Sequence, residues 1–250
     1  MGEIVRVENL FKSFGDNHVL QGASIAFEEG RITSIIGQSG TGKSVLIKNI
    51  IGVLEPDDGD ILFHGKSMVH ASAEERAEMR RRFGYLFQDS ALFDSMTVAE
   101  NIAFPLTEGR GEKDRVRIRD VVQEKLDWIG LPDVGDQYPA ELSGGMRKRV
   151  GLARTLAVQP EVLLFDEPTT GLDPVLAETI NELITKVNQE FGITCILITH
   201  DIQATFRISD YIGFLYDGKI QAQGRPDELS GTKHPVLRQF IANSFAELEV

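Results

Sequence analysis

The chain has 250 residues, and its 26 lysines and arginines are outnumbered by 38 aspartates and glutamates, which gives a formal net charge of −12. A chain of this length suits one compact domain, or a core with a subdomain, and can bury roughly 70–75% of its unfolded surface. The acidic balance argues against a surface that wraps nucleic acid, because such binding rests on neutralising many phosphates with Lys and Arg. Any phosphate-binding site is therefore expected to be local.

The composition also bears on the compartment. No stretch of about 18 residues is continuously apolar, as a membrane-spanning helix requires. The first residues include Glu3 and lack the basic and apolar regions of a secretory signal. The single cysteine, Cys195, cannot form an internal disulfide and lies in an apolar run, where a buried thiol is expected. These features predict a protein of a reducing compartment, the cytoplasm.

The first 65 residues are predicted to form an α/β arrangement that opens with strands. Ala23, Ile25 and Phe27 alternate with other residues in the pattern of a strand. The pattern continues as strand 32–36, a glycine-rich loop, helix 43–54, an acidic turn at 57–59 and strand 61–63. This alternation predicts a sheet with helices packed against it.

The rest of the chain continues this sheet on both sides of a helical insert. Strand 83–87 precedes a segment rich in helix formers and charges, which predicts an insert at about 89–158. The apolar runs 162–165 and 193–199 predict buried parallel strands. Residues 211–223 predict a hairpin closed by Asp-Gly.

The last segment, 232–250, is predicted to be an amphipathic helix that follows a main domain of residues 1–231. Its apolar residues fall on one helical face. They are Val236, Leu237, Phe240, Ile241, Phe245 and Leu248. This face packs either on its own domain or on another subunit, and the pattern is compatible with both.

The strongest motif lies between the predicted strand 32–36 and the following helix, and it matches the P-loop pattern in full. Its residues are Gly37, Gln38, Ser39, Gly40, Thr41, Gly42, Lys43 and Ser44. Glycines let the backbone curl with its N–H groups inward, at a helix N-terminus that favours anions. Lys43 is expected to contact the β- and γ-phosphates, and the Ser44 hydroxyl to coordinate Mg²⁺.

Acidic residues follow the next predicted parallel strand. Asp166 and Glu167 come directly after the apolar run 162–165. Beside a P-loop, Asp166 is expected in the magnesium shell and Glu167 is placed to orient or deprotonate the attacking water. The alternative is a solvated turn or helix start, where acids are common. His200 follows the run 193–199 and is either a γ-phosphate contact or a capping or packing histidine.

A second anion-binding helix start is predicted within the insert. Ser143 is a natural N-cap, and Gly144 and Gly145 leave backbone N–H groups uncovered before the helix 147–157. From the residues alone, an ordinary capped helix remains the alternative.

The order of these motifs resembles the ATPase subunit of ABC transporters over nearly the whole chain. The motifs are the P-loop, Gln88 after the third strand, Leu-Ser-Gly-Gly (142–145), Leu-Leu-Phe-Asp-Glu (163–167), Gly-Leu-Asp (171–173) and His200. The resemblance implies an α/β P-loop NTPase fold with a mixed β-sheet core, an antiparallel β subdomain and a helical insert. It also implies ATP and Mg²⁺ as ligands and ATP hydrolysis as the reaction.

The resemblance assigns further roles. Gln88 would touch Mg²⁺ and water and sense the membrane subunit, and Phe14 would stack on adenine. Glu167 would be the catalytic base, Asp173 would couple two sites, and His200 would be the switch. The alternative interpretations are that Gln88 is a surface amide and that Phe14 is a phenylalanine of the β core. Met146 replaces a glutamine that many members carry, which leaves the backbone donors in place.

The resemblance also implies an assembly. Two copies would face head to tail, so that the Ser143–Gly145 loop of one covers the γ-phosphate held by the P-loop of the other. Other implied partners are integral membrane permease subunits, with a small accessory protein and a lipid-binding subunit as further candidates. The implied location is peripheral, on the cytoplasmic face of the inner membrane, and no nucleic acid is expected.

Within the family, the wording of residues 142–154 and 165–174 is similar to Mla or Mce-type lipid transport systems. That similarity implies phospholipid transport between membranes. The alternative is the ATPase of a small-solute importer, for example one for polar amino acids, and a soluble ABC ATPase outside transport is a third possibility. The cargo is bound by the membrane subunits, so no residue of this chain reads it.

Overall fold

A computed structural model describes residues 2–87 and 90–246. The strands are β1 (Glu3–Phe14), β2 (Asn17–Glu28), β3 (Ile32–Ile36), β4 (Asp58–Phe63), β5 (Lys66–Ser67), β6 (Phe83–Leu86), β7 (Val162–Asp166), β8 (Thr194–Ile198), β9 (Tyr211–Tyr216) and β10 (Lys219–Gly224). The α-helices are α1 (Lys43–Ile50), α2 (Ala73–Arg80), α3 (Val98–Phe104), α4 (Arg115–Trp128), α5 (Gly144–Leu156), α6 (Pro174–Phe191), α7 (Ile202–Ile208), α8 (Pro226–Ser230) and α9 (Pro235–Ala246). A π-helical turn covers Pro105–Gly109 and a 3-10 turn covers Pro139–Glu141.

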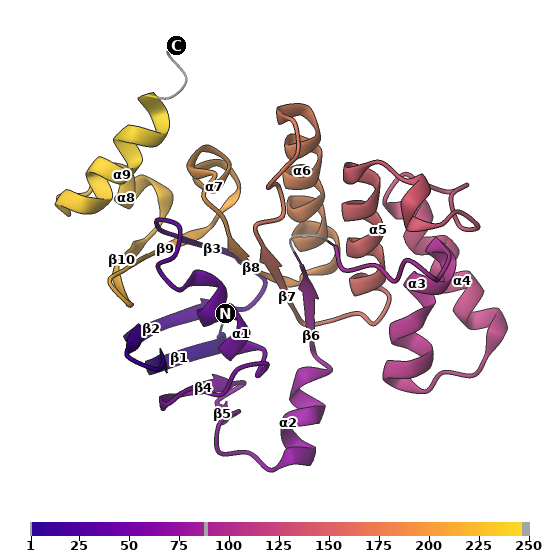
Figure 1. Cartoon of the computed structure of the whole chain (residues 1–250), viewed down its shortest axis with the longest axis horizontal. Helices are drawn as coiled ribbons and strands as arrows, with labels where there is room; N and C mark the ends of the chain where they lie inside the picture. Colours follow the sequence, from indigo (N-terminus) through magenta and orange to yellow (C-terminus); the bar gives the residue numbers. More distant parts are fainter. Residues whose placement is uncertain (1, 88–89, 247–250) are drawn as a thin grey trace.

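Two sheets form the framework (Figure 1). The antiparallel sheet has the strand order β2-β1-β4-β5, and the mixed sheet has the order β10-β9-β3-β8-β7-β6. All neighbours in the mixed sheet are parallel except the β9–β10 hairpin, which turns through Asp217 and Gly218, both with positive φ. The predicted mixed core, antiparallel subdomain and Asp-Gly hairpin are confirmed.

Two predicted boundaries are wrong. Helix 43–54 ends at Ile50, because Gly52 adopts a φ of 69° and the chain turns there. The acidic turn at 57–59 is instead largely the start of β4. Asp58 pairs with Phe11 of β1, and the Asp57 carboxylate accepts hydrogen bonds from Lys12 and the Ser13 backbone, so contacts with β1 extend the strand.

The core has apolar layers on both faces of the mixed sheet. One face packs with α1 against the antiparallel sheet, through Leu46, Ile47 and Ile50. The other face packs against α5 and α6. Adjacent strand residues divide between these layers: Leu164 faces the α1 side and Leu163 the α6 side. The continuous apolar runs of the sequence therefore belong to strands buried on both faces.

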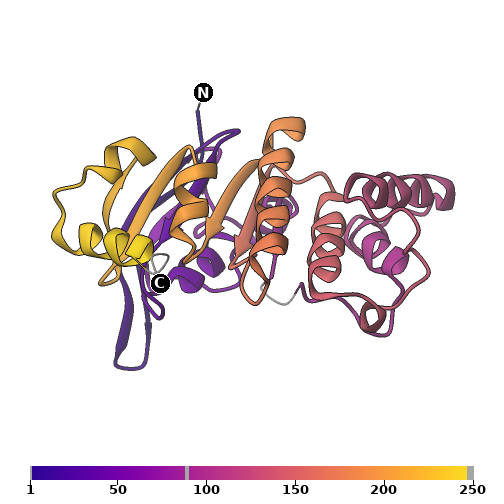
Figure 2. The same cartoon turned by 90° about the horizontal axis from the view of Figure 1, so that it is seen from above.

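Helices α3, α4 and α5 pack around a separate apolar cluster and form a lobe beside the sheet (Figure 2). The C-terminal α9 docks on its own domain, where the fully buried Leu237 packs among residues that include Ile202, Phe214 and Leu229. The insert limits of about 89–158 and the division after residue 231 stay predictions. In the part of the chain that the structure describes, no helix is long and apolar enough to span a membrane.

Candidate active site

The P-loop curls between β3 and α1 in the conformation its glycines permit. Gly42 is the N-cap of α1 with a φ of 98°, and a Cβ there would lie 2.7 Å from Val19 of β2. A Cβ on Gly37 would lie 2.4 Å from the Leu215 carbonyl oxygen. Side chains at these two positions would displace the loop. The loop therefore presents its backbone at a helix N-terminus, an arrangement that binds anions.

Lys43 extends back into this loop. Its Nζ atom donates to the carbonyl oxygens of Gly37 at 2.8 Å and Gln38 at 3.0 Å, and the residue is only 6% exposed. Burial lowers the pKa of Lys43, and the charges of Glu167 and Asp166 oppose that shift. The ammonium group therefore sits where a phosphate in the loop would gain a direct charge-assisted contact.

The carboxyl end of β7 brings Asp166 to the P-loop. The Ser44 hydroxyl donates to Oδ1 of Asp166 at 3.0 Å, and the Tyr85 hydroxyl donates to Oδ2 of the same carboxylate at 2.8 Å. Burial and the hydrogen bond to Asp166 raise the pKa of Tyr85, so the phenol stays protonated. Hydroxyl and carboxylate oxygens completed by substrate phosphates are the donors that Mg²⁺ takes, so the residues fit this ion.

Glu167 and His200 form a hydrogen-bonded pair one residue beyond β7 and two beyond β8. His200 Nδ1 lies 2.6 Å from Oε2 of Glu167, and the Thr170 hydroxyl donates to the same oxygen at 3.2 Å. Partial burial would raise the pKa of Glu167, but His200, Lys43 and Thr170 together hold it below its ordinary value. The hydrogen bond with Glu167 raises the pKa of His200. Glu167 is therefore kept as a carboxylate near neutral pH, the form that accepts a proton.

The predicted second anion-binding helix start is the N-terminus of α5. The Ser143 hydroxyl accepts from the Met146 backbone N–H at 3.3 Å, which confirms Ser143 as the N-cap. The neighbours of Gly144 and Gly145 are Leu172 and Leu176. In the described chain, this loop therefore packs on the segment after β7. The P-loop of the same chain packs on β2 and β9 instead.

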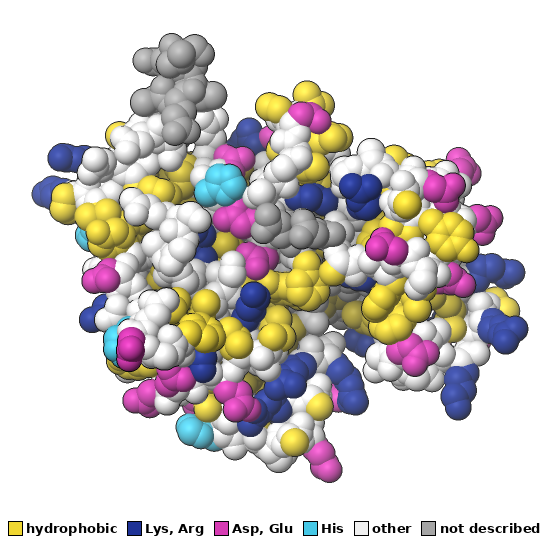
Figure 3. Space-filling view, in the orientation of Figure 1, with side chains coloured by type: hydrophobic (Ala, Val, Ile, Leu, Met, Phe, Trp, Pro, Cys, Tyr) yellow, Lys and Arg dark blue, Asp and Glu magenta, His cyan; other side chains and the backbone are white. Residues whose placement is uncertain are grey.

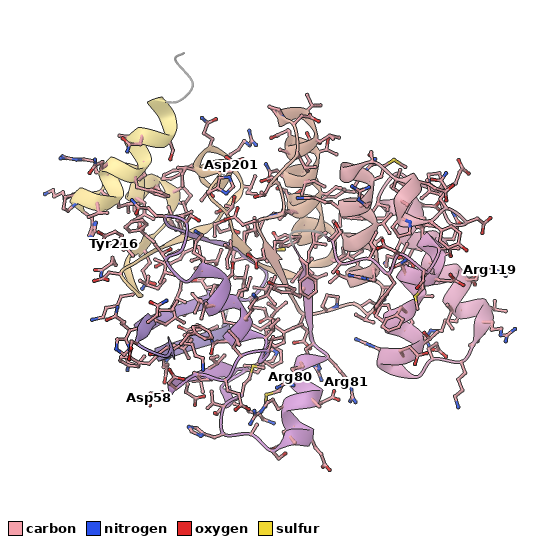
Figure 4. All side chains as sticks on the ribbon, viewed as in Figure 1. Asp58, Arg80, Arg81, Arg119, Asp201 and Tyr216 are labelled. Atoms are coloured by element: carbon pink, nitrogen blue, oxygen red, sulfur yellow. The ribbon has the colours of Figure 1, made fainter. Side chains whose placement is uncertain are left out.

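Two further predicted residues, Asp173 and Phe14, lie at the start of α6 and at the end of β1. Asp173 caps α6 by accepting from the N–H groups of Val175 and Leu176, both at 3.0 Å. Phe14 is 49% exposed in the β1–β2 hairpin, the same hairpin whose Val19 abuts Gly42. Asp201, beside His200, caps α7 (Figure 4). Gln88 lies outside the described residues.

Sequence reasoning missed three residues of the site: Tyr85, Thr170 and Lys148. The Lys148 ammonium is buried and donates to the carbonyl oxygens of Pro168 and Thr170 at 2.6 and 2.9 Å. These hydrogen bonds connect α5 to the loop that follows Glu167. Its position in a basic run carried no sign of this contact. For Tyr85, the only available signal was a polar aromatic in an otherwise apolar strand.

The fold and the site together define a P-loop NTPase with an inserted helical lobe. A family model described as ABC transporter matches residues 20–170. The chain belongs to the ABC transporter family and is the ATP-binding, ATP-hydrolysing subunit of such a transporter.

Relatives span almost the whole chain. A probable ribonucleotide transport ATP-binding protein of Mycobacterium leprae is 41% identical over 96% of this chain and 69% of its own length. The ATP-binding protein MlaF of an intermembrane phospholipid transport system in Haemophilus influenzae is 37% identical over 95% of this chain and 90% of its own.

Solved structures give the same assignment. CbiO1 of Clostridium perfringens, part of an ABC transporter complex, is 31% identical and covers 100% of both chains with a TM-score of 0.85. A dimeric ATP-binding cassette in a post-hydrolysis state, bound to ADP and Pi, is also 31% identical. It covers 89% of this chain and 98% of its own, with a TM-score of 0.80.

Proposed function

We propose that this subunit couples ATP hydrolysis to phospholipid transport between membranes. The observation that carries the chemistry is the convergence of Lys43, Ser44, Asp166, Glu167 and His200 at one edge of the mixed sheet. The cargo is supported by the MlaF relatives of Haemophilus influenzae and Escherichia coli, which the chain matches over 90% and 89% of their lengths.

In the proposed reaction, the P-loop backbone and Lys43 hold the β- and γ-phosphates of ATP. Glu167 accepts a proton from a water molecule as the water oxygen attacks the γ-phosphorus. The bond from that phosphorus to the bridging oxygen breaks, and ADP leaves. His200 orients the Glu167 carboxylate through the 2.6 Å hydrogen bond. Ser44 and Asp166 would hold Mg²⁺, together with Gln88, and the ion would neutralise charge on the phosphates.

The proposed assembly is a head-to-tail dimer. The Ser143 hydroxyl caps α5, and the Ser143–Gly145 loop packs on the segment after β7. We expect the N-terminus of α5 to meet the ATP of a second copy. Asp173 caps α6 beside this loop and is suited to link the two sites. Phe14 would stack on adenine. A solved relative is dimeric with ADP and Pi bound, which supports this arrangement.

The proposed location is the cytoplasmic face of the inner membrane, bound to permease subunits, with a small accessory protein and a lipid-binding subunit as further partners. Hydrophobic side chains reach the surface between the sheet and the helical lobe (Figure 3). Phe87, just after β6, and Phe93, ahead of α3, are 45% and 41% exposed. This surface is the proposed groove for a permease helix.

The test is purification of the tagged chain from detergent-extracted membranes. We expect a polytopic membrane protein to co-purify, and lipid analysis of that complex to show phospholipid above the level of a mock purification. Recovery with ribosomes or DNA and without a membrane protein would contradict the transporter assignment. A membrane complex free of bound phospholipid would contradict the cargo alone.

A second cargo is favoured by one finding, the 41% identity to proteins named for probable ribonucleotide transport. The small-solute importer is the wider form of this alternative. Uptake assays on the reconstituted complex separate these cargoes: transfer of labelled phospholipid between vesicles supports the proposal, whereas ATP-dependent uptake of labelled ribonucleotide or polar amino acid supports the alternative.

A further inference from the structure

The Asp166 carboxylate is held through both of its oxygens by residues from two different elements. Ser44, at the start of α1, donates to Oδ1 at 3.0 Å, and Tyr85 on β6 donates to Oδ2 at 2.8 Å. The final torsion of an aspartate side chain is broad and roughly two-fold, so a single partner leaves the two oxygens free to rock or exchange. Two partners on opposite oxygens fix the plane of the carboxylate.

The sheet explains why Tyr85 reaches this carboxylate. Tyr85 is paired with Leu164 in the parallel β6–β7 ladder, and Asp166 lies two residues beyond Leu164. Residues two apart on a strand project from the same face, so Tyr85 and Asp166 both face α1 and Ser44. The Phe87 ring packs edge-on against Tyr85 with centroids 4.3 Å apart, which restrains the phenol ring.

We infer that Tyr85 is a positioning residue for the hydrolysis reaction: its hydroxyl fixes the Asp166 carboxylate so that Oδ1 stays directed toward Ser44 and the metal position. This inference rests on the metal role proposed for Ser44 and Asp166. Hydrogen bonds that orient metal-binding carboxylates commonly contribute tenfold to a hundredfold to metal affinity. Tyr85 acts through Asp166 and is not itself a ligand in this arrangement.

The test is Tyr85→Phe, which removes the hydroxyl and keeps the ring that fills the space beside α1. Mn²⁺ replaces Mg²⁺ as a paramagnetic probe, and its binding to the folded chain with a non-hydrolysable ATP analogue is followed by electron paramagnetic resonance. We expect the Mn²⁺ affinity to fall by about tenfold or more. The affinity for the analogue in EDTA is expected to stay at the wild-type value. A general structural defect would weaken both.

Tyr211→Phe is the matched control, because Tyr211 begins β9 beside Thr33, near the amino end of β3, whereas the P-loop follows the carboxyl end of that strand. It should bind Mn²⁺ like the wild type. Wild-type Mn²⁺ affinity in Tyr85→Phe would overturn the inference. Ser44→Ala separates this failure from that of the proposed metal site. If Ser44→Ala weakens Mn²⁺ binding and Tyr85→Phe does not, only the positioning role of Tyr85 fails. If neither variant weakens Mn²⁺ binding, the positioning role and the proposed metal site both fail.

Discussion

Glu167 adopts a backbone conformation that few non-glycine residues take. Its φ is 51°, and its backbone N–H donates to the Ile198 carbonyl oxygen at 2.9 Å. A left-handed residue of this kind carries strain of order 1 kcal/mol or more and persists where its surroundings hold it. Here the Ile198 carbonyl holds the backbone, and His200 and Thr170 hold the carboxylate. The strained turn therefore directs the proposed base toward the P-loop.

Replacement of Glu167 by glutamine keeps the shape of the side chain and removes its ability to accept a proton. We expect Glu167→Gln to bind ATP close to the wild-type affinity, since Lys43 and the loop are unchanged, and to lose at least about a hundredfold in turnover. Phosphate release and equilibrium nucleotide binding measure the two quantities. Normal steady-state hydrolysis by this variant would remove Glu167 from the role of base.

Lys43→Ala is the complementary change. It should weaken ATP binding by about tenfold or more, because a charge-assisted contact with the phosphates is lost. Together the two variants distinguish a residue that binds ATP from one that acts on it.

The sequence predicts the residues of this site that follow the ends of buried strands and misses a contact that depends on strand register. Asp166, Glu167 and His200 were predictable because they follow buried parallel strands, whose ends meet at one edge. Tyr85 was not, because its contact with Asp166 depends on the register of β6 against β7. The start of β4 was mispredicted for the same reason, since its pairing with β1 overrides the local turn signal of Asp57-Asp58-Gly59.

At the scale of elements, an ion-pair cluster joins the two sheets at the amino ends of β6 and β7, whereas the site lies at the carboxyl ends of the strands. Glu161, just before β7, is bound by His64 from the β4–β5 turn at 2.6 Å and by Arg82 from the start of β6. Partial burial would raise the pKa of Glu161, but the His64 and Arg82 hydrogen bonds outweigh it and lower the pKa. The carboxylate is therefore more stable in the folded chain than in the unfolded chain.

This cluster predicts a pH-dependent stability. A carboxyl group with a lowered folded pKa stabilises the fold above its unfolded pKa, about 4.3 for glutamate, and that contribution is lost as the pH falls through the folded pKa. Glu161→Gln should cost about 0.2–1 kcal/mol at pH 7, because the pair is partly exposed. The difference from wild type should shrink in urea unfolding at increasingly acidic pH. The control is Glu55→Gln, whose carboxylate pairs with Arg76 and is 79% exposed. A difference that grew on acidification would contradict the prediction.

Leu237 is the most deeply buried of the α9 side chains that the structure describes, and Val236, Phe240 and Ile241 pack in the same cluster. Leu237 packs with Phe214 of β9 and Leu229 of α8, and its removal leaves a cavity between three elements. Leu237→Ala should lower the free energy of unfolding by about 2–5 kcal/mol. Arg238→Ala, at the neighbouring exposed position, should change it by no more than about 0.5 kcal/mol. Urea denaturation measures both, and equal effects would show that α9 contributes nothing to the fold through this face.

At the scale of the whole molecule, the net charge is negative, whereas the phosphate site is locally positive. The chain carries a net charge of −12, and Lys and Arg side chains on the viewed face gather around α2 and the outer side of the helical lobe (Figure 3). A polyphosphate is therefore attracted by the backbone N–H groups of the P-loop and by Lys43, and the overall field opposes its approach. The same net charge repels two copies of the chain, so a dimer needs specific contacts that outweigh this repulsion.

In the proposed dimer, each ATP site combines the P-loop of one copy with the Ser143–Gly145 loop of the other. This arrangement predicts complementation between two inactive variants. Lys43→Ala weakens phosphate binding in one copy and leaves its Ser143–Gly145 loop intact. Gly144→Glu places a negative charge in that loop and leaves the P-loop intact, and the fold accepts it because a Cβ on Gly144 meets nothing closer than Leu172 at 3.8 Å. Each variant alone should be inactive in the assembled transporter.

Co-expression under two different tags, with purification through both, gives complexes that contain one copy of each variant. In a two-fold dimer with composite sites, one of the two sites then has an intact P-loop facing an intact loop, and the other has neither. We expect about half of the wild-type ATP turnover from these complexes, because one of two sites is complete. If each site were built within a single chain, every site would retain one defect, and the mixed complexes would be as inactive as either variant alone.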